Sequence, residues 1–78
     1  ANMSTTCLIV DDEKLARDLL REYLEGFPEI EILGECSQGN EAVEKIEKLK
    51  PDLLFLDVQM PGMTGFDVLE EIEHEPYV

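Results

Sequence analysis

Residues 53–57 read LLFLD, a short apolar run that stops at a carboxylate. A run of this kind between turn-forming segments is typical of a strand that is buried on both faces of a parallel sheet. The same pattern occurs at residues 7–11, which read CLIVD, and a second carboxylate, Asp12, follows directly. Residues 30–33 (IEIL) alternate between apolar and polar, which predicts a third strand with one face in water. The two buried strands therefore both end at acidic side chains.

Amphipathic helices are predicted between and after these strands, because apolar residues recur there at three- and four-residue steps with charged residues between them. These helices cover residues 15–24, 42–49 and 66–72. Residues 34–40 predict a turn, with Asn40 as the N-cap of the second helix.

The third helix carries its own start signal. Thr64 is followed three residues later by Asp67, a spacing that predicts an N-terminal cap. We expect Pro76 to break this helix, because proline cannot continue one. Its apolar stripe consists of Phe66, Leu69 and Ile72.

Strands and helices alternate along the whole chain, and residues 77–78 resemble the first residues of a fourth strand. Alternation with short loops predicts an α/β fold, in which helices cover both faces of a parallel sheet. Right-handed crossovers limit how the strands can be arranged.

Composition narrows the classes of function. The chain has 78 residues with a net charge of −13, which allows one small domain and argues against direct contact with nucleic acid or an anionic membrane. No apolar run approaches the roughly 18 residues of a membrane span, and no secretory signal is present at the start. We therefore expect a cytoplasmic protein in which Cys7 and Cys36 are reduced, buried apolar residues.

The acidic residues after the two buried strands form a candidate site. The carboxyl ends of parallel strands lie at one edge of a sheet, so Asp11, Asp12 and Asp57 converge if these strands are neighbours. Carboxylates about 4 Å apart repel by about 4 kcal/mol at an effective dielectric of ~20, which either protonation or a bound cation could offset. Carboxylate oxygens suit Mg²⁺, which could in turn neutralise a phosphoryl group arriving at the third carboxylate.

Two blocks of sequence resemble a known family. Residues 8–13 (LIVDDE) and residues 54–66 (LFLDVQMPGMTGF) are similar to the acidic pair and to the phosphorylated-aspartate block of response-regulator receiver domains in two-component signalling. Residues 34–37 and 50–52 also fit, most like the regulators with LytTR-type DNA-binding output domains. The resemblance implies a flavodoxin-like (CheY-like), doubly wound parallel sheet, here with the strand order 2-1-3.

The resemblance also implies roles for individual residues. Asp57 would accept a phosphoryl group from a sensor histidine kinase, as a carboxylate nucleophile. Asp12 would ligate Mg²⁺ directly, and Asp11 would do so directly or through water. Gln59 would offer its backbone carbonyl to the metal, and Asp57 itself would complete the set. The resemblance implies a phosphorylation switch for an output domain, which binds DNA in the LytTR-type regulators, and not a classical enzyme.

The chain departs from the family in extent. We expect residues 1–4 to be a cloning remnant and N-terminal tail, and residues 5–78 to be a partial receiver domain, a fragment without strands four and five. The family's Ser or Thr after strand four and its Lys after strand five then have no counterpart here. The outer edge of the third strand would lack a neighbour, which predicts self-association through that edge or through exposed helix faces.

Two other functions stay open at this point. A Mg²⁺-dependent phosphatase would also use an aspartyl nucleophile, but such enzymes carry Asp-x-Asp on one strand, whereas Asp11 and Asp12 are adjacent. A half-domain that only associates with itself is the second alternative. His74, a single histidine between glutamates, is interpreted as a solvated side chain.

Overall fold

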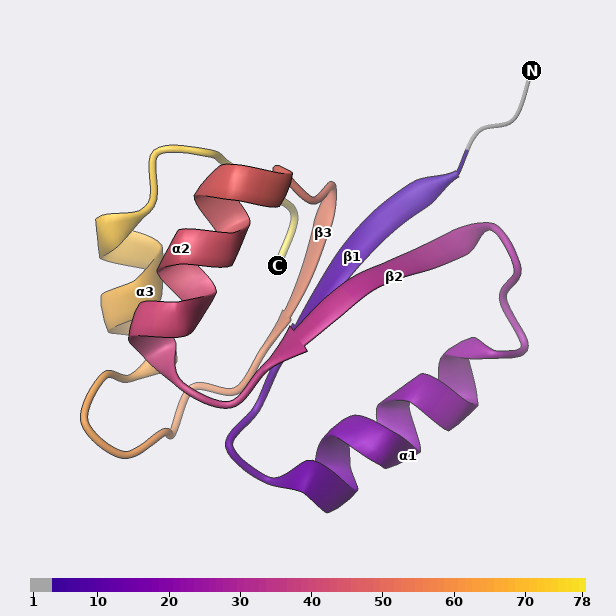
Figure 1. Cartoon of the computed structure of the whole chain (residues 1–78), viewed down its shortest axis with the longest axis horizontal. Coiled ribbons are helices and arrows are strands. Elements are labelled where there is room, and N and C mark those ends of the chain that lie inside the picture. The colour runs from indigo at the N-terminus through magenta and orange to yellow at the C-terminus, as the bar shows by residue number, and fades with distance from the viewer. Residues whose placement is uncertain (1–3) are drawn as a thin grey trace.

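The computed structural model describes residues 4–78, which form a three-stranded parallel sheet with a helix after each strand (Figure 1). The strands are β1 (Thr5–Val10), β2 (Ile30–Cys36) and β3 (Leu53–Leu56), and the helices are α1 (Lys14–Leu24), α2 (Gly39–Leu49) and α3 (Gly65–Glu71). The order β2-β1-β3, with both pairs parallel, confirms the predicted fold class. Most of the predicted N-terminal tail, residues 1–3, lies outside the described residues. Within residues 4–78, none of the helices has the length and apolar content needed to cross a bilayer.

Helices cover both faces of the sheet. Helix α1 lies on one face, and α2 and α3 lie together on the other (Figure 1). Because side chains alternate along a strand, Leu8 and Val10 of the central strand β1 face α2 and α3, whereas Cys7 and Ile9 face α1. All four are buried, which confirms the prediction of a strand enclosed on both faces.

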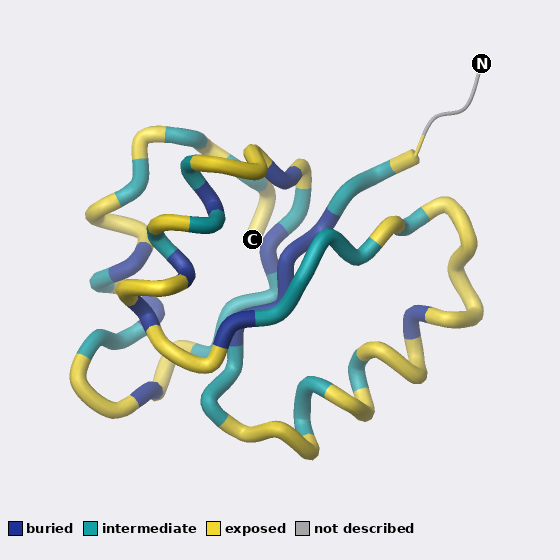
Figure 2. The backbone as a smooth tube through the Cα atoms, viewed as in Figure 1, coloured by how far each residue is buried: buried dark blue, intermediate teal, exposed yellow. Residues whose placement is uncertain are grey.

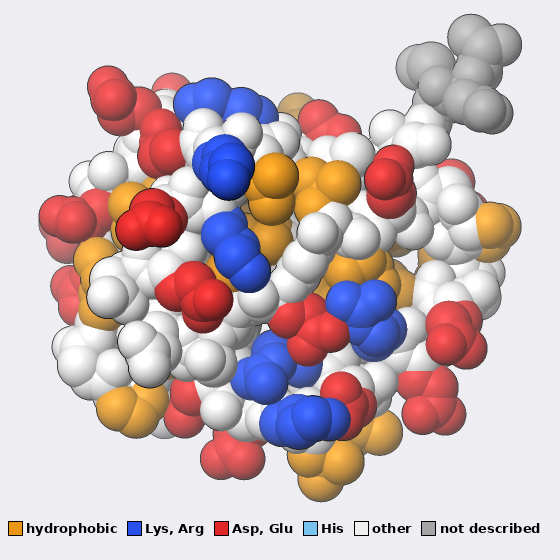
Figure 3. Space-filling view, viewed as in Figure 1, with side chains coloured by type: hydrophobic (Ala, Val, Ile, Leu, Met, Phe, Trp, Pro, Cys, Tyr) orange, Lys and Arg blue, Asp and Glu red, His pale blue; other side chains and the backbone are white. Residues whose placement is uncertain are grey.

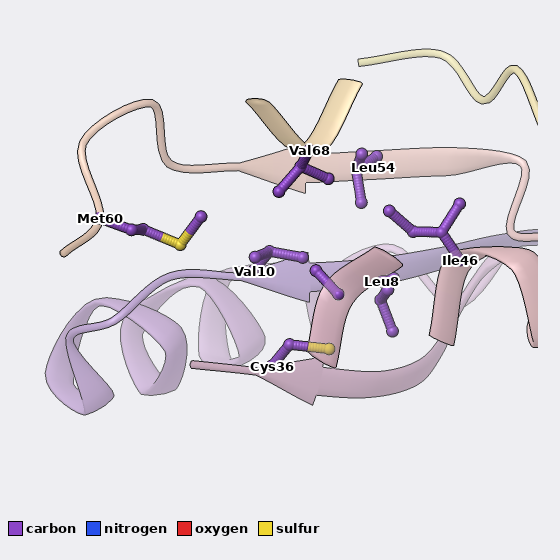
Figure 4. Close-up of a cluster of buried hydrophobic side chains, with 8 residues drawn as sticks. Leu8, Val10, Cys36, Ile46, Leu54, Met60 and Val68 are labelled. Carbon is purple, nitrogen blue, oxygen red and sulfur yellow. The ribbon is translucent and has the colours of Figure 1, made fainter. Parts of the chain in front are cut away.

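The larger core lies between the sheet and the pair α2 and α3 (Figure 4). Leu8, Val10 and Leu54 project from the strands toward Ile46 of α2 and Val68 of α3. Fully burying a side chain of this size stabilises a fold by roughly 1.5–3 kcal/mol. This face of the sheet therefore fixes the positions of α2 and α3, and with them the loops on either side of the acidic edge.

Both cysteines are free and buried, as the sequence predicts. Desolvation raises the pKa of the Cys7 thiol, and it raises the pKa of the Cys36 thiol to about 11. Because the thiolate is the reactive form, both thiols behave as small apolar core groups.

The other face of the sheet is less completely covered. Leu20 and Leu24 of α1 pack toward β1, but Leu15, Leu19 and Tyr23 are 69%, 58% and 68% exposed. Figure 2 shows the resulting exposed outer surface of α1. The apolar pattern thus predicted the helix correctly, but it includes more apolar residues than the sheet buries.

Two predictions about residues 34–40 are wrong. Residues 34–36 continue β2 instead of turning, because they pair in parallel with residues 8–10 of β1. Helix α2 then begins at Gly39, and Gln38 occupies the N-cap without a side-chain hydrogen bond. Asn40 lies inside the helix, where its side-chain oxygen accepts from the backbone N–H of Glu41 at 2.9 Å.

Helix α3 confirms the predicted cap but not the predicted stripe. The Thr64 hydroxyl accepts from the Asp67 backbone N–H at 3.2 Å, and the Asp67 carboxylate accepts from the Thr64 N–H at 2.9 Å. The helix ends at Glu71, well before Pro76. Its buried residues are Gly65 and Val68, whereas Phe66 of the predicted stripe is 65% exposed. Ile72, just beyond the helix, packs against the core.

The last residues return to the outer edge of β3, which was expected to lack a neighbour, and they form a single bridge there instead of a fourth strand. Tyr77 forms a parallel bridge with Leu53. The Tyr77 N–H donates to the Asp52 carbonyl at 3.0 Å, and the Leu54 N–H donates to the Tyr77 carbonyl at 2.7 Å. This bridge covers the start of the β3 edge only.

His74 is half-buried, so its interpretation as a solvated side chain is wrong. Its Nε2 lies 2.6 Å from the carbonyl oxygen of Pro51. The Glu47 carboxylate of α2 accepts from the backbone N–H groups of His74 and Glu73, at 3.0 and 2.8 Å. These bonds lower the pKa of Glu47, the His74 N–H most strongly. His74 thus has a structural role in fastening the end of the chain to α2 and β3.

Candidate functional site

The acidic residues meet at the carboxyl edge of the sheet. Because Val10 of β1 is paired with Leu56 of β3, the residues that follow them, Asp11 and Asp57, leave the sheet side by side. The Asp57 N–H still donates to the Val10 carbonyl at 2.9 Å. One carboxylate oxygen from each of Asp11, Asp12 and Asp57 lies within 4.8 Å of the other two. The sequence thus predicted correctly which three side chains come together.

Two of the three carboxylates are held by short turns of the backbone. Asp11 Oδ1 accepts from the Glu13 N–H at 2.9 Å, and Asp57 Oδ1 accepts from the Gln59 N–H at 3.1 Å. Each bond commits one oxygen and sets the direction of the other. Gln59 is exposed. That its backbone carbonyl serves as a metal ligand stays a prediction.

The donor set fits a hard divalent cation. All three side chains are half-buried carboxylates that gather without a nitrogen or sulfur ligand in the cluster. Mg²⁺ prefers oxygen ligands and binds through one or two carboxylates together with water and phosphate oxygens. A dication would also offset the repulsion among three neighbouring negative charges.

Open space adjoins the carboxylates. A cavity of about 580 Å³ lies beside Asp12, between the loop after β2 and the loop after β3. Its lining comprises Asp12, Ser37, Gln38, Gly39, Asn40, Pro61, Gly62 and Met63. Gly62 has a φ of 82°, a backbone conformation that suits glycine, so the Pro61–Gly62 turn shapes this wall. The acidic edge is therefore open on the side of Asp12.

Gly65, which the sequence reasoning did not single out, sets the distance between α3 and the loop that carries Asp57. A Cβ at this position would lie 2.5 Å from the Asp57 carbonyl oxygen and 2.9 Å from Val58 Cα. The Gly65 N–H donates to the Val58 carbonyl at 3.2 Å. The only sequence signal was a glycine directly after the predicted cap residue Thr64.

Arg17 and Glu35 were also missed. The Arg17 guanidinium donates to the backbone carbonyl of Asp11 at 2.6 Å and to the Glu35 carboxylate at 3.0 Å. Arg21 donates to the other oxygen of Glu35 at 2.6 Å, and this hydrogen bond is the main reason that the pKa of Glu35 is lowered. No motif marks these residues, because the arginines look like part of a solvated helix face and Glu35 lies in a segment that the sequence predicts to be a turn.

The fold and the acidic edge define a class: a doubly wound α/β domain with three aspartates at the switch point of its sheet. Comparison with known proteins agrees, since the family model of the response regulator receiver domain matches residues 7–78. The chain belongs to the family of response-regulator receiver domains of two-component systems.

Relatives and solved structures extend this assignment. The chain is 51% identical over 73 residues to the transcriptional regulatory protein BtsR of Salmonella typhi, and 47% identical over 68 residues to an uncharacterized response regulatory protein of Shewanella oneidensis. These matches cover 91% and 87% of this chain but only 30% and 29% of the relatives. The response regulator domain of Thermotoga maritima CheB superposes with a TM-score of 0.86 at 33% identity, over 95% of this chain and 56% of that one.

Proposed function

We propose that this chain is part of a receiver domain that accepts a phosphoryl group on Asp57 in a step that requires Mg²⁺. The cluster of Asp11, Asp12 and Asp57 at one sheet edge is the observation that supports this most directly. Receiver domains of response regulators interact with histidine kinases, so the proposed donor is the phosphohistidine of a sensor kinase. The domain then acts as a switch for an output domain, and not as an enzyme with turnover.

The proposed chemistry is a single transfer. An oxygen of Asp57 attacks the phosphorus while the P–N bond to the kinase histidine breaks, and the imidazole leaves with the bonding electrons and takes up a proton. The hydrogen bond from the Gln59 N–H orients the carboxylate for this attack. Asp11, Asp12, Asp57 and the Gln59 carbonyl would hold Mg²⁺, which when bound supplies positive charge beside the transferred phosphoryl oxygens.

A small phosphodonor tests this proposal without a kinase. We expect incubation with an acyl phosphate and Mg²⁺ to give one phosphoryl adduct by intact mass, and chelation of the metal to suppress it. An adduct that forms equally well in chelator, or none in a chain that is folded by circular dichroism, would contradict the proposal. A phosphatase would instead release inorganic phosphate continuously from a phosphoester.

The output is proposed from the relatives. BtsR is named a transcriptional regulatory protein, and the match covers less than a third of it, so a DNA-binding output domain would lie elsewhere in a longer regulator. The net charge of −13 supports the proposal that this segment itself contacts neither nucleic acid nor membrane. We further propose that it acts in the cytoplasm.

Self-association is a second proposal, supported by uncovered surface. Within residues 4–78 the outer edge of β3 meets only the single bridge at Tyr77, and Phe66 and Tyr77 are 65% and 83% exposed. Unpaired strand edges and exposed apolar side chains favour pairing with a second chain.

We expect light scattering to show a dimer or larger species whose fraction rises with salt, because salt screens the net charge of −13. A monomer at every protein and salt concentration would contradict self-association. That result would leave the proposed phosphotransfer unaffected.

A further inference from the structure

Asp11 is held by its backbone as well as by its side chain. Its N–H donates to the Cys36 carbonyl of β2 at 3.0 Å, and its carboxylate accepts from the Glu13 N–H at 2.9 Å. Its carbonyl oxygen accepts from Nη1 of Arg17 at 2.6 Å. The peptide between Asp11 and Asp12, which sets where the Asp12 side chain points, is thus held by a guanidinium.

Arg17 is in turn fixed by Glu35. The side chain of Arg17 is 15% exposed, and its Nε donates to the Glu35 carboxylate at 3.0 Å. Glu35 also binds Arg21 through its second oxygen, and its backbone carbonyl accepts from Lys45 Nζ of α2 at 3.1 Å. Figure 3 shows basic side chains gathered with acidic ones over α1 and β2. The hydrogen bonds of Arg17 and Glu35 therefore connect α1, β2 and α2 to the acidic edge.

We infer that Arg17 is a positioning residue for the acidic edge, which fixes the Asp11–Asp12 peptide so that both carboxylates already face the cation. This inference rests on the proposed function. A planar guanidinium can bind the Asp11 carbonyl and the Glu35 carboxylate at the same time in a fixed geometry. An ammonium group has the same charge but not this fork.

Arg21 provides a matched control. It binds the same carboxylate of Glu35 at 2.6 Å but has no hydrogen bond to Asp11 among those of the described residues. Replacing either arginine with methionine removes one positive charge and one ion pair with Glu35. Only Arg17→Met also releases the Asp11 carbonyl.

The test measures Mg²⁺ affinity by titration calorimetry in Arg17→Met, Arg17→Lys and Arg21→Met. We expect Arg17→Met to weaken Mg²⁺ binding by about ten- to hundredfold, the range for partners that orient metal ligands, and Arg21→Met to change it little. We expect Arg17→Lys to bind Mg²⁺ more weakly than the parent chain as well. Equal losses in both methionine variants, or parent-like binding in Arg17→Lys, would mean that Arg17 affects Mg²⁺ only through its charge. Either result would overturn the inference.

A metal-free measurement separates this inference from the proposed function. Amide hydrogen exchange reports on the N–H groups of Asp11 and Glu13, whose bonds to Cys36 and to the Asp11 carboxylate depend on the same turn. We expect both amides to lose protection in Arg17→Met and to keep it in Arg21→Met. Unchanged protection in Arg17→Met would overturn the inference, whether or not the parent chain binds Mg²⁺. A parent chain that fails to bind Mg²⁺ would count only against the proposed function.

Discussion

Replacing Asp57 with asparagine is expected to abolish the phosphoryl adduct that Mg²⁺ and a small phosphodonor produce. The amide that replaces the carboxylate is not a nucleophile at neutral pH, whereas its oxygen can still accept the hydrogen bond from the Gln59 N–H. The local turn should therefore persist while the chemistry is lost. Intact mass after incubation with the donor measures the result.

The control for this experiment is Asp18→Asn. Asp18 lies on the exposed surface of α1, where it pairs with Lys14 at 2.8 Å. We expect this variant to form the adduct as the parent chain does. An adduct of unchanged yield in Asp57→Asn would show that another carboxylate accepts the phosphoryl group.

The same substitution should not destabilise the metal-free fold. Two unit charges 4.8 Å apart, the outer limit for this cluster, repel by on the order of 3 kcal/mol at an effective dielectric of about 20, and by less where water screens them. Removing one of three such charges relieves part of that repulsion. A loss of adduct together with unchanged or higher thermal stability would thus exclude unfolding as its cause.

The second large effect is expected at Gly65. In Gly65→Ala the new Cβ would lie 2.5 Å from the carbonyl oxygen of Asp57, and a backbone atom cannot move aside as a flexible side chain can. Forcing an extra methyl group into a packed site typically costs about 1–3 kcal/mol, and we expect the upper end here. Urea unfolding measures this loss in the free energy of unfolding.

Gly34→Ala is the matched control, because its Cβ would lie 3.7 Å from Leu8 Cδ1, an ordinary contact. We expect a small change in stability for this variant. Similar losses in the two variants would mean that the close approach of α3 to the Asp57 loop is not what requires Gly65.

The order of the elements could be predicted from the sequence because each depends on local periodicity. The apolar runs at residues 7–10 and 53–56 have no polar face, which predicts enclosure on both sides. Residues 7–10 are all buried, whereas in β3 only Leu54 is buried and its neighbours are half-buried. The end of β2 could not be predicted in this way. Residues 34–36 contain a glycine and a glutamate and are strand only because β1 lies beside them.

The sequence pattern also could not predict which apolar residues of a helix face the core. Leu15, Leu19 and Tyr23 recur with helical spacing as regularly as Leu20 and Leu24 do, but the sheet covers only one of these stripes. Periodicity gives the helix and its apolar residues, whereas the position of the neighbouring layer decides burial.

Some residues of the candidate site could be predicted from the sequence and others could not. Asp11, Asp12 and Asp57 could be predicted because they come within two residues of the ends of two strands that the fold makes neighbours. Arg17 and Glu35 are 18 positions apart and become partners only when α1 packs beside the end of β2. Side chains that support a site from a neighbouring element carry no local signal of that role.

Mg²⁺ titration of the parent chain beside Asp12→Asn tests the central claim most directly. Asp12 is the informative position, because its carboxylate belongs to the cluster and no hydrogen bond to it is found within residues 4–78. Since affinity for hard cations follows the number of carboxylate charges, we predict one Mg²⁺ per parent chain and binding weaker by about tenfold or more in Asp12→Asn. Equal affinity in the two chains would contradict a cation site built from these three aspartates.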